Sequence, residues 1–571
     1  MTLVRTLSTT LAVMGLVAVA CGGAAAPTAT KAPAAPAAAA TATQAAPSFR
    51  PTTPTPGAAA PAPTAAVVAS SKPSGKVTIH GNNAGSAPDL DPGSWQSGER
   101  GLYRVVYEPL MFMDPDGKNY LSPILATSWE MSKDGLSWTF HLRKGVKFQN
   151  GEDFDAEVMA KSMKRARGLQ SAFFHENTAG YEFPDKYTML LKLKKPDLGL
   201  LSRLVYGSRI GYPAPSKYID EAGEPAIGKS ATVASGLIRR SPIGTGPYKL
   251  VKYDPQTPEI VLEAWEDWGG YWGYRPTIKT IREIGIPEET VRLAALATGE
   301  IDIAKVSPGP TLKELKAGKV VTSTSVTVRW WEFFQQGIAD SPYNNIKVRQ
   351  AMNYAVDKEA MIDKLLSGAA ILSGQSISPL QFGYNPSAKP YPFDPQKAKQ
   401  LLAEAGFANG FDGGVIIAAS EADRVEGAAI ADYLGRVGIK LRLEPMDSAT
   451  KSRRWIPPVH DLHTIKGIGS LGSSLAGDGD YRIESFFTKW GQWGYTVDPD
   501  LDALYEKTLT VVDQGEKEKV LQSLALMTNE KAYKLFMWYP KTIYAWGPRI
   551  ADWKLTPGED VADGFQTIRL K

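Results

Sequence analysis

Residues 326–368 decide the fold of this 571-residue chain, and they read VTVRWWEFFQQGIADSPYNNIKVRQAMNYAVDKEAMIDKLLSG. The first ten residues are rich in β-branched and aromatic types, which favours a partly buried strand over 326–335. Successive side chains of a strand point to opposite faces, so Trp330 and Trp331 are expected on different faces. Each face of this strand therefore carries a large indole.

Helical spacing follows the strand. Apolar residues recur at intervals of three and four from Val348 to Leu366. Asp357, with Glu359 just inside, reads as a second N-cap with an acidic residue placed to complement the helix dipole. This pattern predicts one bent helix or two abutting helices that end at Gly368.

Two further segments repeat the order strand, helix, strand. One spans 278–303 and includes a helix that ends at Gly299, and the other spans 414–444. This alternation favours parallel sheets covered by helices, so the chain is predicted to be α/β. At 571 residues it is also too long for one ordinary core, and we expect two or three lobes.

The stretch PYNNIKVRQAMNYAVDKEAMIDKLLSG closely resembles a signature region of the family 5 solute-binding proteins of ABC importers. These are the dipeptide, oligopeptide and nickel binding proteins. Other segments resemble the family in the same order, namely residues 89–92, the block at 121–158, SPIGTGPYKLV from residue 241 and GEID at 299–302. The resemblance extends from about residue 76 to the C-terminus.

The resemblance implies a two-lobed, type II periplasmic-binding-protein-like clamshell with an extra domain inserted in the first lobe. By analogy, lobe I comprises 75–100, 231–325 and 545–571, the extra domain is 101–230, and lobe II is 326–544. The chain would cross between lobes near residues 325 and 545. A ligand that contacts both lobes only when they close favours the closed state.

The N-terminus has the pattern of a secretory signal, with Arg5, an apolar run at 11–20 and small residues before Cys21. Residues 18–22, AVACG, resemble a bacterial lipobox, which implies that residues 1–20 are removed and Cys21 is lipidated. The alternative is an incidental thiol in an ordinary signal peptide. Residues 21–74 are mostly Ala, Pro and Thr, too few apolar residues to form a core, so we expect a disordered tether.

The charge of the chain argues against nucleic acid as the main partner. The net charge of +4 is supplied by Arg5, Lys31, Arg50 and Lys72, because residues 1–74 contain no acidic residue. The rest of the chain has equal numbers of basic and acidic residues. Phosphate binding needs clustered positive charge instead. The expected partners are a solute, a membrane permease and, through the lipid, the outer face of the cytoplasmic membrane, with the protein a monomer.

Motifs for covalent, metal or cofactor chemistry are weak, so we expect no catalytic residue, metal or cofactor. Cys21 is the only cysteine, and neither G-x-S-x-G nor H-E-x-x-H occurs. Residues 467–472 spell G-x-G-x-x-G, but no helix pattern follows, which predicts a flexible glycine loop. His460 and His463 are metal candidates, with surface or packed histidines as the alternative. An exported hydrolase acting on oligosaccharides or peptides, or a surface adhesin, is the rival class.

Candidate ligand contacts are mostly indoles, since a Trp can line a cleft or fill a core. The candidates are Trp455, Trp330, Trp331, Trp95, Arg454, Ser470 and Trp493. Trp455 lies in the polar context TKSRRWIPP. Counting from Asp461, it falls where members of the resembled family place a ligand-facing residue between strand and loop.

Two residues of the resembled family that are missing here affect which kind of solute we expect. The family's peptide binders place a tryptophan and, three residues later, an aspartate that holds the peptide α-ammonium. Counting from Asp461, these positions fall at Gly467 and Ser470, so neither residue is present, and Asp478 or Asp480 could replace the acid only in a rearranged loop. A buried ammonium without its counter-charge costs several kcal/mol. We therefore expect free di- and tripeptides to bind poorly, and a stacked oligosaccharide or other polar organic molecule to suit the site.

Overall fold

The computed structural model describes most of the chain after residue 71. The described residues are 72–81, 105–112, 121–166, 174–197, 199–202, 204, 210–222, 241–254, 259–270, 275–309, 319–324, 326–455, 461, 464–473, 479–489, 491, 493–494, 496–511, 513–553 and 568–571. The predictions for Cys21, Trp95, His460, His463 and Asp478 fall outside these residues.

The predicted strand and paired helices are confirmed. Strand β13 is Val328–Phe333, and it leads to helices α9, Ile346–Ala355, and α10, Lys358–Leu366. There are two abutting helices, because the Asp357 side chain accepts a hydrogen bond from the backbone N–H of Ala360 and starts a new helix. Left-handed backbone at Ser367 and Gly368 then ends α10.

The two faces of β13 enter different cores, as the alternation predicts. Trp331 packs with Val348 and Met352 of α9. On the other face, Trp330 packs with Ile483 and meets the ring of Phe486 edge-on at 5.0 Å. Helices α14, α15 and α16 supply this second core, with bounds Gly479–Phe487, Pro499–Thr508 and Gln514–Glu530.

One large mixed sheet contains β13. Its order among the described strands is β16-β15-β17-β13-β18-β11-β1-β10-β9-β8, with β12 and β14 also paired to β18. The bounds are β16 Ile439–Pro445, β15 Phe411–Ala418, β17 Gly467–Ser473, β18 Lys534–Trp546, β11 Ile303–Lys305, β1 Ser74–His80, β10 Ile278–Ile284, β9 Glu259–Ala264, β8 Tyr248–Asp254, β12 Lys319–Thr324 and β14 Ala370–Leu372.

Both predicted strand, helix, strand units are present and contain parallel strands. In the first, β10 and β11 lie on either side of β1 and parallel to it, with α7, Glu289–Thr298, between them in the chain. In the second, β15 and β16 are parallel neighbours joined by α12, Glu421–Gly435. Gly299 follows α7 with a φ of 77°, a conformation that glycine adopts readily.

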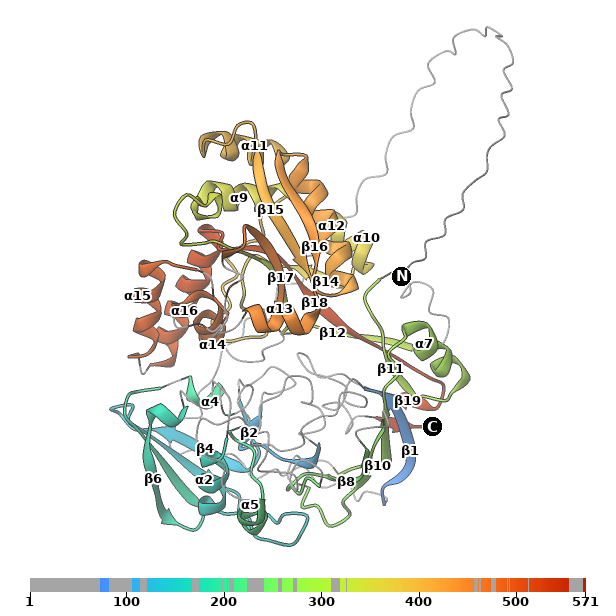
Figure 1. Cartoon of the computed structure of the whole chain (residues 1–571). Coiled ribbons are helices and arrows are strands. Elements are labelled where there is room, and N and C mark those ends of the chain that lie inside the picture. The colour runs from blue at the N-terminus through green and yellow to red at the C-terminus, as the bar shows by residue number, and fades with distance from the viewer. Residues whose placement is uncertain are drawn as a thin grey trace, which may run out of the picture. The chain divides into compact units, whose positions relative to one another are not determined.

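Strand β18 serves both parts of the sheet (Figure 1). Its residues from Lys534 to Trp538 pair with β13, while those from Lys541 to Trp546 pair with β12. Pro540 lies between these two halves of β18. The predicted domain limits, including the crossing near residue 545, stay predictions.

A separate four-stranded sheet lies within the region predicted as the extra domain. Its order is β4-β5-β7-β6, and a turn at Asp134 and Gly135 joins β4 to β5. The bounds are β4 Ala126–Met131, β5 Ser137–Leu142, β6 Thr178–Asp185 and β7 Thr188–Leu193. Helix α2, Ala156–Lys164, packs with this sheet and is capped by Asp155.

Smaller elements complete the described chain. They are β2 Met111–Phe112, β3 Ser122–Pro123, α4 Leu200–Ser202, α5 Ser216–Ala222, η2 Pro342–Asn344, α11 Pro395–Glu404, α13 Ser448–Trp455, β19 Ile550–Asp552 and β20 Arg569–Leu570. Among the helices described, none combines the length and apolar character needed to span a membrane.

Gly244 and Gly246 are required for a different reason from the usual one. Glycine often serves backbone angles closed to other residues, but neither of these glycines is among those with positive φ. Instead, a Cβ on Gly244 would lie 2.0 Å from the carbonyl oxygen of Val106, and one on Gly246 would lie 2.6 Å from that of Val105. Close packing of two backbones therefore explains both glycines.

Candidate functional site

Residues 467–472 form part of strand β17, so the predicted glycine loop is wrong. β17 pairs with β13 on one side and with β15 on the other. A Cβ on Gly469 would lie 2.4 Å from Cζ of Phe334 and 3.2 Å from Cζ3 of Trp455. The glycine is therefore needed because two aromatic rings cover the strand at this point.

Those rings belong to what we call the Trp455 cluster, made of Phe334, Ile417, Trp455 and Gly469. Trp455 is the last residue of α13 and is only 1% exposed. Its ring meets that of Phe334 edge-on at 5.5 Å, and its Nε1 donates to the carbonyl oxygen of Trp493 at 3.5 Å. Trp455 therefore lies at a helix end, where we expected a position between strand and loop.

Lys451, one helical turn before Trp455, ties the cluster to β17. Its Nζ donates to the carbonyl oxygen of Ser470 at 2.6 Å and to Ser470 Oγ at 2.8 Å, and it lies 5.5 Å from the centre of the Trp455 ring. Burial lowers the pKa of Lys451 to about 8, although the Asp423 carboxylate opposes that shift. Sequence analysis selected Ser470 but missed Lys451.

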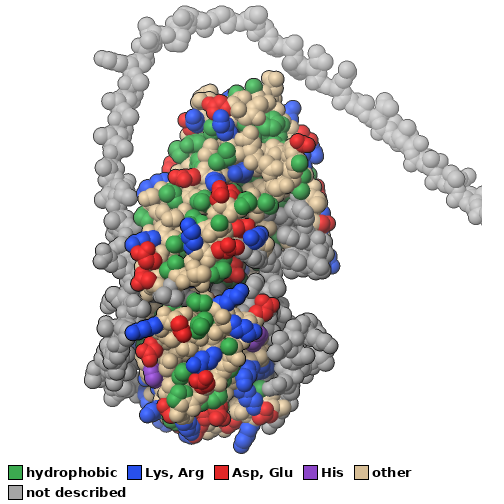
Figure 2. Space-filling model, turned by 90° about the vertical axis from the view of Figure 1, so that its left-hand side faces the viewer, with side chains coloured by type: hydrophobic (Ala, Val, Ile, Leu, Met, Phe, Trp, Pro, Cys, Tyr) green, Lys and Arg blue, Asp and Glu red, His purple; other side chains and the backbone are tan. Residues whose placement is uncertain are grey.

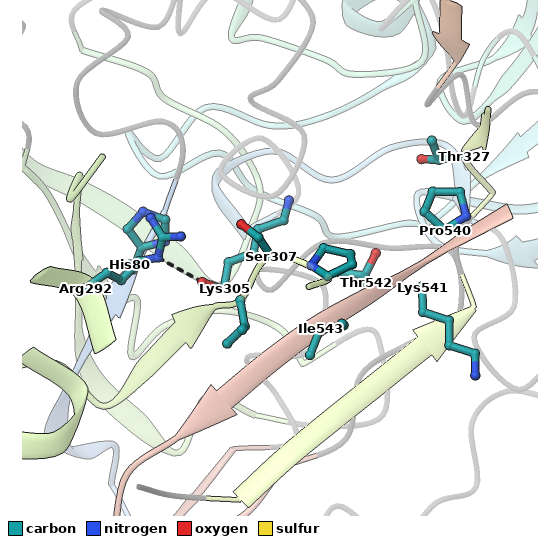
Figure 3. Close-up of a pocket in the computed structure, with 11 residues that line it drawn as sticks. His80, Arg292, Lys305, Ser307, Thr327, Pro540, Lys541, Thr542 and Ile543 are labelled. Atoms are coloured by element: carbon teal, nitrogen blue, oxygen red, sulfur yellow. Dashed lines mark hydrogen bonds between the residues drawn. The ribbon is translucent and has the colours of Figure 1, made fainter. Parts of the chain in front are cut away.

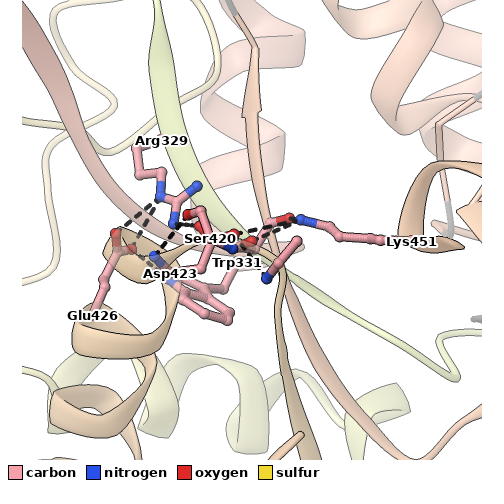
Figure 4. Close-up of polar contacts among 8 residues, drawn as sticks. Arg329, Trp331, Ser420, Asp423, Glu426 and Lys451 are labelled. Carbon is pink, nitrogen blue, oxygen red and sulfur yellow. Dashed lines mark hydrogen bonds and ion pairs between the residues drawn. The ribbon is translucent and has the colours of Figure 1, made fainter. Parts of the chain in front are cut away.

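A network of buried charges continues from Lys451 (Figure 4). Arg329 on β13 donates through Nε to Glu426, at 3.0 Å, and through Nη2 to Asp423, at 2.5 Å. Burial raises the pKa of Asp423, but the guanidinium of Arg329 outweighs this and the pKa is about 2. Two cations thus face two carboxylates, so the formal charges of the network balance.

Trp331 joins this network, since its Nε1 donates to Glu426 Oε1 at 2.5 Å. Asp423 also accepts from the backbone N–H groups of Ala419 and Ser420, which holds the start of α12 against the carboxyl end of β15. The only sequence signal for the network was the pair of acids three residues apart after Ser420.

The predicted site residues are thus partly brought together. Trp455, Ser470 and Trp493 meet around the Trp455 cluster, whereas Arg454 pairs with Asp461 at 2.9 Å. Trp330 and Trp331 have no exposed surface and fill cores. The binding role of all these residues stays a prediction.

The carboxylate of Asp480 is already paired with two other side chains. It is buried, its Oδ2 lies 2.5 Å from Lys517 Nζ, and its Oδ1 accepts from Thr508. A carboxylate already paired with a buried ammonium supplies no counter-charge for a peptide α-ammonium. Within the described part of the chain, no three His, Cys, Asp or Glu side chains are grouped so as to hold a metal ion.

Comparison with known proteins relates this architecture to one family. The model of the bacterial extracellular solute-binding proteins, family 5 Middle, matches residues 121–508. Heme-binding protein A of Haemophilus influenzae is 33% identical over 322 residues, which are 52% of this chain and 56% of that protein. The glutathione-binding protein GsiB of Salmonella paratyphi A is 30% identical over 393 residues, 67% of this chain and 72% of that protein. The chain thus spans about half the length of the first relative and more of the second.

Solved structures share the fold at lower identity. The substrate-binding protein CtaP of Listeria monocytogenes has a TM-score of 0.73 and 21% identity, covering 87% of this chain and all of that one. DppA of Helicobacter pylori, in complex with the peptide STSA, has a TM-score of 0.69 and 23% identity, covering 87% of this chain and 98% of that one. The predicted fold class, the two-lobed type II periplasmic-binding-protein fold, is confirmed.

Proposed function

Because the chain belongs to the bacterial extracellular solute-binding proteins of family 5, we propose that it captures a polar organic solute outside the cytoplasm and delivers it to an ABC permease. The match over residues 121–508 carries this proposal. The relatives reported above are binding proteins, so at the level of the family the chain groups with binding proteins and not with hydrolases.

The shared strand supports a closing motion. β18 pairs with β13 through one half and with β12 through the other, and Pro540 lies between the two halves. A solute held by both parts binds the closed arrangement more tightly than the open one, and so shifts the population towards it.

The solute itself is proposed from this chain's own residues, because the relatives bind different molecules by name: heme, glutathione and dipeptide. We propose an oligosaccharide or another polar, peptide-like organic molecule that contacts Trp493 and Arg454, which keep exposed surface, while Trp455 and Ser470, 1% and 0% exposed, support the site from within. Trp330 and Trp331 have no exposed surface, so we propose that they support the site through packing.

The charge distribution supports a small solute as the partner. On the described part of the face drawn in Figure 2, basic and acidic side chains are interspersed and do not separate into single-sign regions. We also propose that the protein is a monomer held at the outer face of the cytoplasmic membrane by a lipid on Cys21.

Native mass spectrometry of the gently purified full chain tests the proposal. We expect a bound organic molecule, which raises the melting temperature by mass action and reduces the radius of gyration in small-angle scattering. Trp455→Ala should weaken binding of that molecule by about 1 kcal/mol or more. Turnover of maltotriose or trialanine by the purified chain, without a change in radius, would favour the hydrolase.

A further inference from the structure

A cavity of about 360 Å³ opens beside the part of β18 that changes partners. Figure 3 shows His80 and Arg292 towards one end of it, Thr327 and Pro540 towards the other, and Ser307 between them. His80 ends β1 and Ser307 follows β11, which are parallel neighbours. Ligands of open α/β sheets bind at the carboxyl ends of parallel strands, so the cavity lies where a binding site is expected.

The cavity is lined by cationic and hydroxyl side chains. Arg292 and Lys305 supply positive charge, while the ammonium of Lys541 points away from them in Figure 3, and none of the described residues that line the cavity is acidic. Glu289 of α7 reaches this set from outside: its carboxylate lies 4.0 Å from Arg292 Nη2 and accepts from the backbone N–H of Ser307 at 3.0 Å. It offsets part of the charge of Arg292 and occupies the backbone N–H of Ser307, so the hydroxyl of Ser307 is the group of that residue offered to a ligand.

Arg292 and Lys305 differ in how firmly they are held. Arg292 donates through Nε to the carbonyl oxygen of Lys305 at 2.9 Å and through Nη1 to that of Ile286 at 2.9 Å, which fixes the guanidinium. The Lys305 ammonium forms no ion pair with any carboxylate in the described part of the chain. A fixed cation beside an adjustable one suits an anion that enters from solvent.

We propose that this cavity binds a small oxyanion group, a carboxylate, sulfate or phosphate, through Lys305, Arg292 and Ser307. Residues 540–542 lie on the strand shared by the two parts of the sheet, so an anion held here also biases how those parts are arranged. The anion is either a charged group of the captured solute or a free inorganic ion. Only the first source rests on the proposed function.

Titration calorimetry with inorganic phosphate and with sulfate, on the full chain at constant ionic strength, tests the site. We expect saturable binding that Lys305→Gln weakens by about tenfold. Lys279→Gln is the control, because Lys279 is exposed on β10 of the same sheet and does not line the cavity. Absence of saturable binding, or equal affinities of the two variants, would overturn the proposal.

Native mass spectrometry separates the two sources. If phosphate displaces a co-purified organic molecule, the charged group of the solute occupies the cavity, and if both bind together, a free anion does. A chain that captures a solute but binds neither phosphate nor sulfate contradicts the anion site alone. A chain that binds phosphate but neither carries nor closes on an organic molecule contradicts the proposed function and leaves the cavity site standing.

Discussion

Lys451 Nζ lies 2.6 Å from the carbonyl oxygen and 2.8 Å from the hydroxyl oxygen of Ser470, so one largely buried ammonium joins helix α13 to strand β17. The same ammonium lies 4.0 Å from Asp423 and 5.5 Å from the centre of the Trp455 ring. It therefore connects the buried charge network to the Trp455 cluster.

Lys451→Met should destabilise the fold, because it removes the ammonium that connects the charge network to the Trp455 cluster. The substitution leaves the carbonyl and hydroxyl of buried Ser470 without their donor, which costs about 1–3 kcal/mol of the free energy of unfolding. Urea denaturation measures this loss. Lys440→Met, at an exposed position of β16, is the matched control and should change stability by less than about 0.5 kcal/mol. Equal midpoints for both variants would show that the contact does not stabilise the fold.

Gly469→Ala tests why glycine is needed in β17. The new Cβ would lie 2.4 Å from Cζ of Phe334, so the ring must shift, and overpacking of this kind costs about 1–3 kcal/mol. Gly435→Ala, where nothing lies within 4 Å of the new Cβ, should leave stability unchanged or raise it by up to about 1 kcal/mol. The melting temperatures of both variants test this. A Gly469→Ala protein as stable as wild type would mean that the rings do not require glycine here and would support the flexible glycine segment predicted from sequence.

Features of the fold that depend on neighbours in sequence were predictable. Asp357 could be identified as an N-cap from sequence because the N–H group that its carboxylate binds, that of Ala360, is only three residues further along the chain. Strand β18, Lys534–Trp546, is harder to recognise in the sequence over its first half. Its first half, KLFMWY, is buried throughout and so lacks the alternation that marks a strand with one exposed face.

Features of the site that depend on distant residues were not predictable. Arg329 and Glu426 are 97 residues apart in the chain, and no local pattern connects them. Gly469 is a glycine because of Phe334 and Trp455, which reach it from other elements. The sequence GIGSLG by itself has the composition of a flexible loop. Its glycine at 469 is explained only by the aromatic rings that cover the strand in the folded protein.

Lys358 makes stability depend on pH. It is buried, its Nζ donates to the carbonyl oxygen of Asn353, and burial lowers its pKa to about 7. The pKa in an unfolded chain is about 10.4, so between these values the unfolded state binds more protons and stability rises with pH. Below pH 7 the ammonium is charged in both states and this contribution is constant.

Unfolding measured from pH 6 to 10 should therefore separate wild type from Lys358→Met. The stability of wild type relative to this variant should rise above pH 7, with a ceiling of about 1.4 kcal/mol per pH unit for one proton. Lys364→Met, on the exposed side of the same helix, controls for the loss of a lysine and should give a flat difference. A flat difference for Lys358→Met as well would refute the prediction.

Cys21→Ser should release the protein from membranes. A single acyl chain binds a bilayer only marginally while several hold firmly, so a lipoprotein resists washing and the variant does not. Fractionation followed by immunoblotting measures the membrane-bound share, and an unchanged melting temperature shows that the released variant is folded. A mature N-terminus at another residue, without lipid, would contradict the lipobox interpretation.

Unmodified trialanine should bind poorly, because the acid that holds a peptide α-ammonium in peptide binders of the family is not expected at its usual place in this chain. Counting from Asp461 predicts that the tryptophan and aspartate of the family's peptide binders are replaced near Gly467 and Ser470, and Asp480 is paired with Lys517 at 2.5 Å. Burial of an ammonium without a counter-charge costs several kcal/mol, enough to remove micromolar affinity.

In calorimetry, trialanine should bind more than about 100-fold more weakly than the co-purified molecule. N-acetylation of the peptide should not change its affinity. Asp480→Asn serves as an internal test, since it should destabilise the fold by stranding the Lys517 ammonium without altering the response to peptide. Micromolar binding of trialanine that is lost on acetylation would show that another acid has taken over the role, and Asp478→Asn would then identify or exclude that residue.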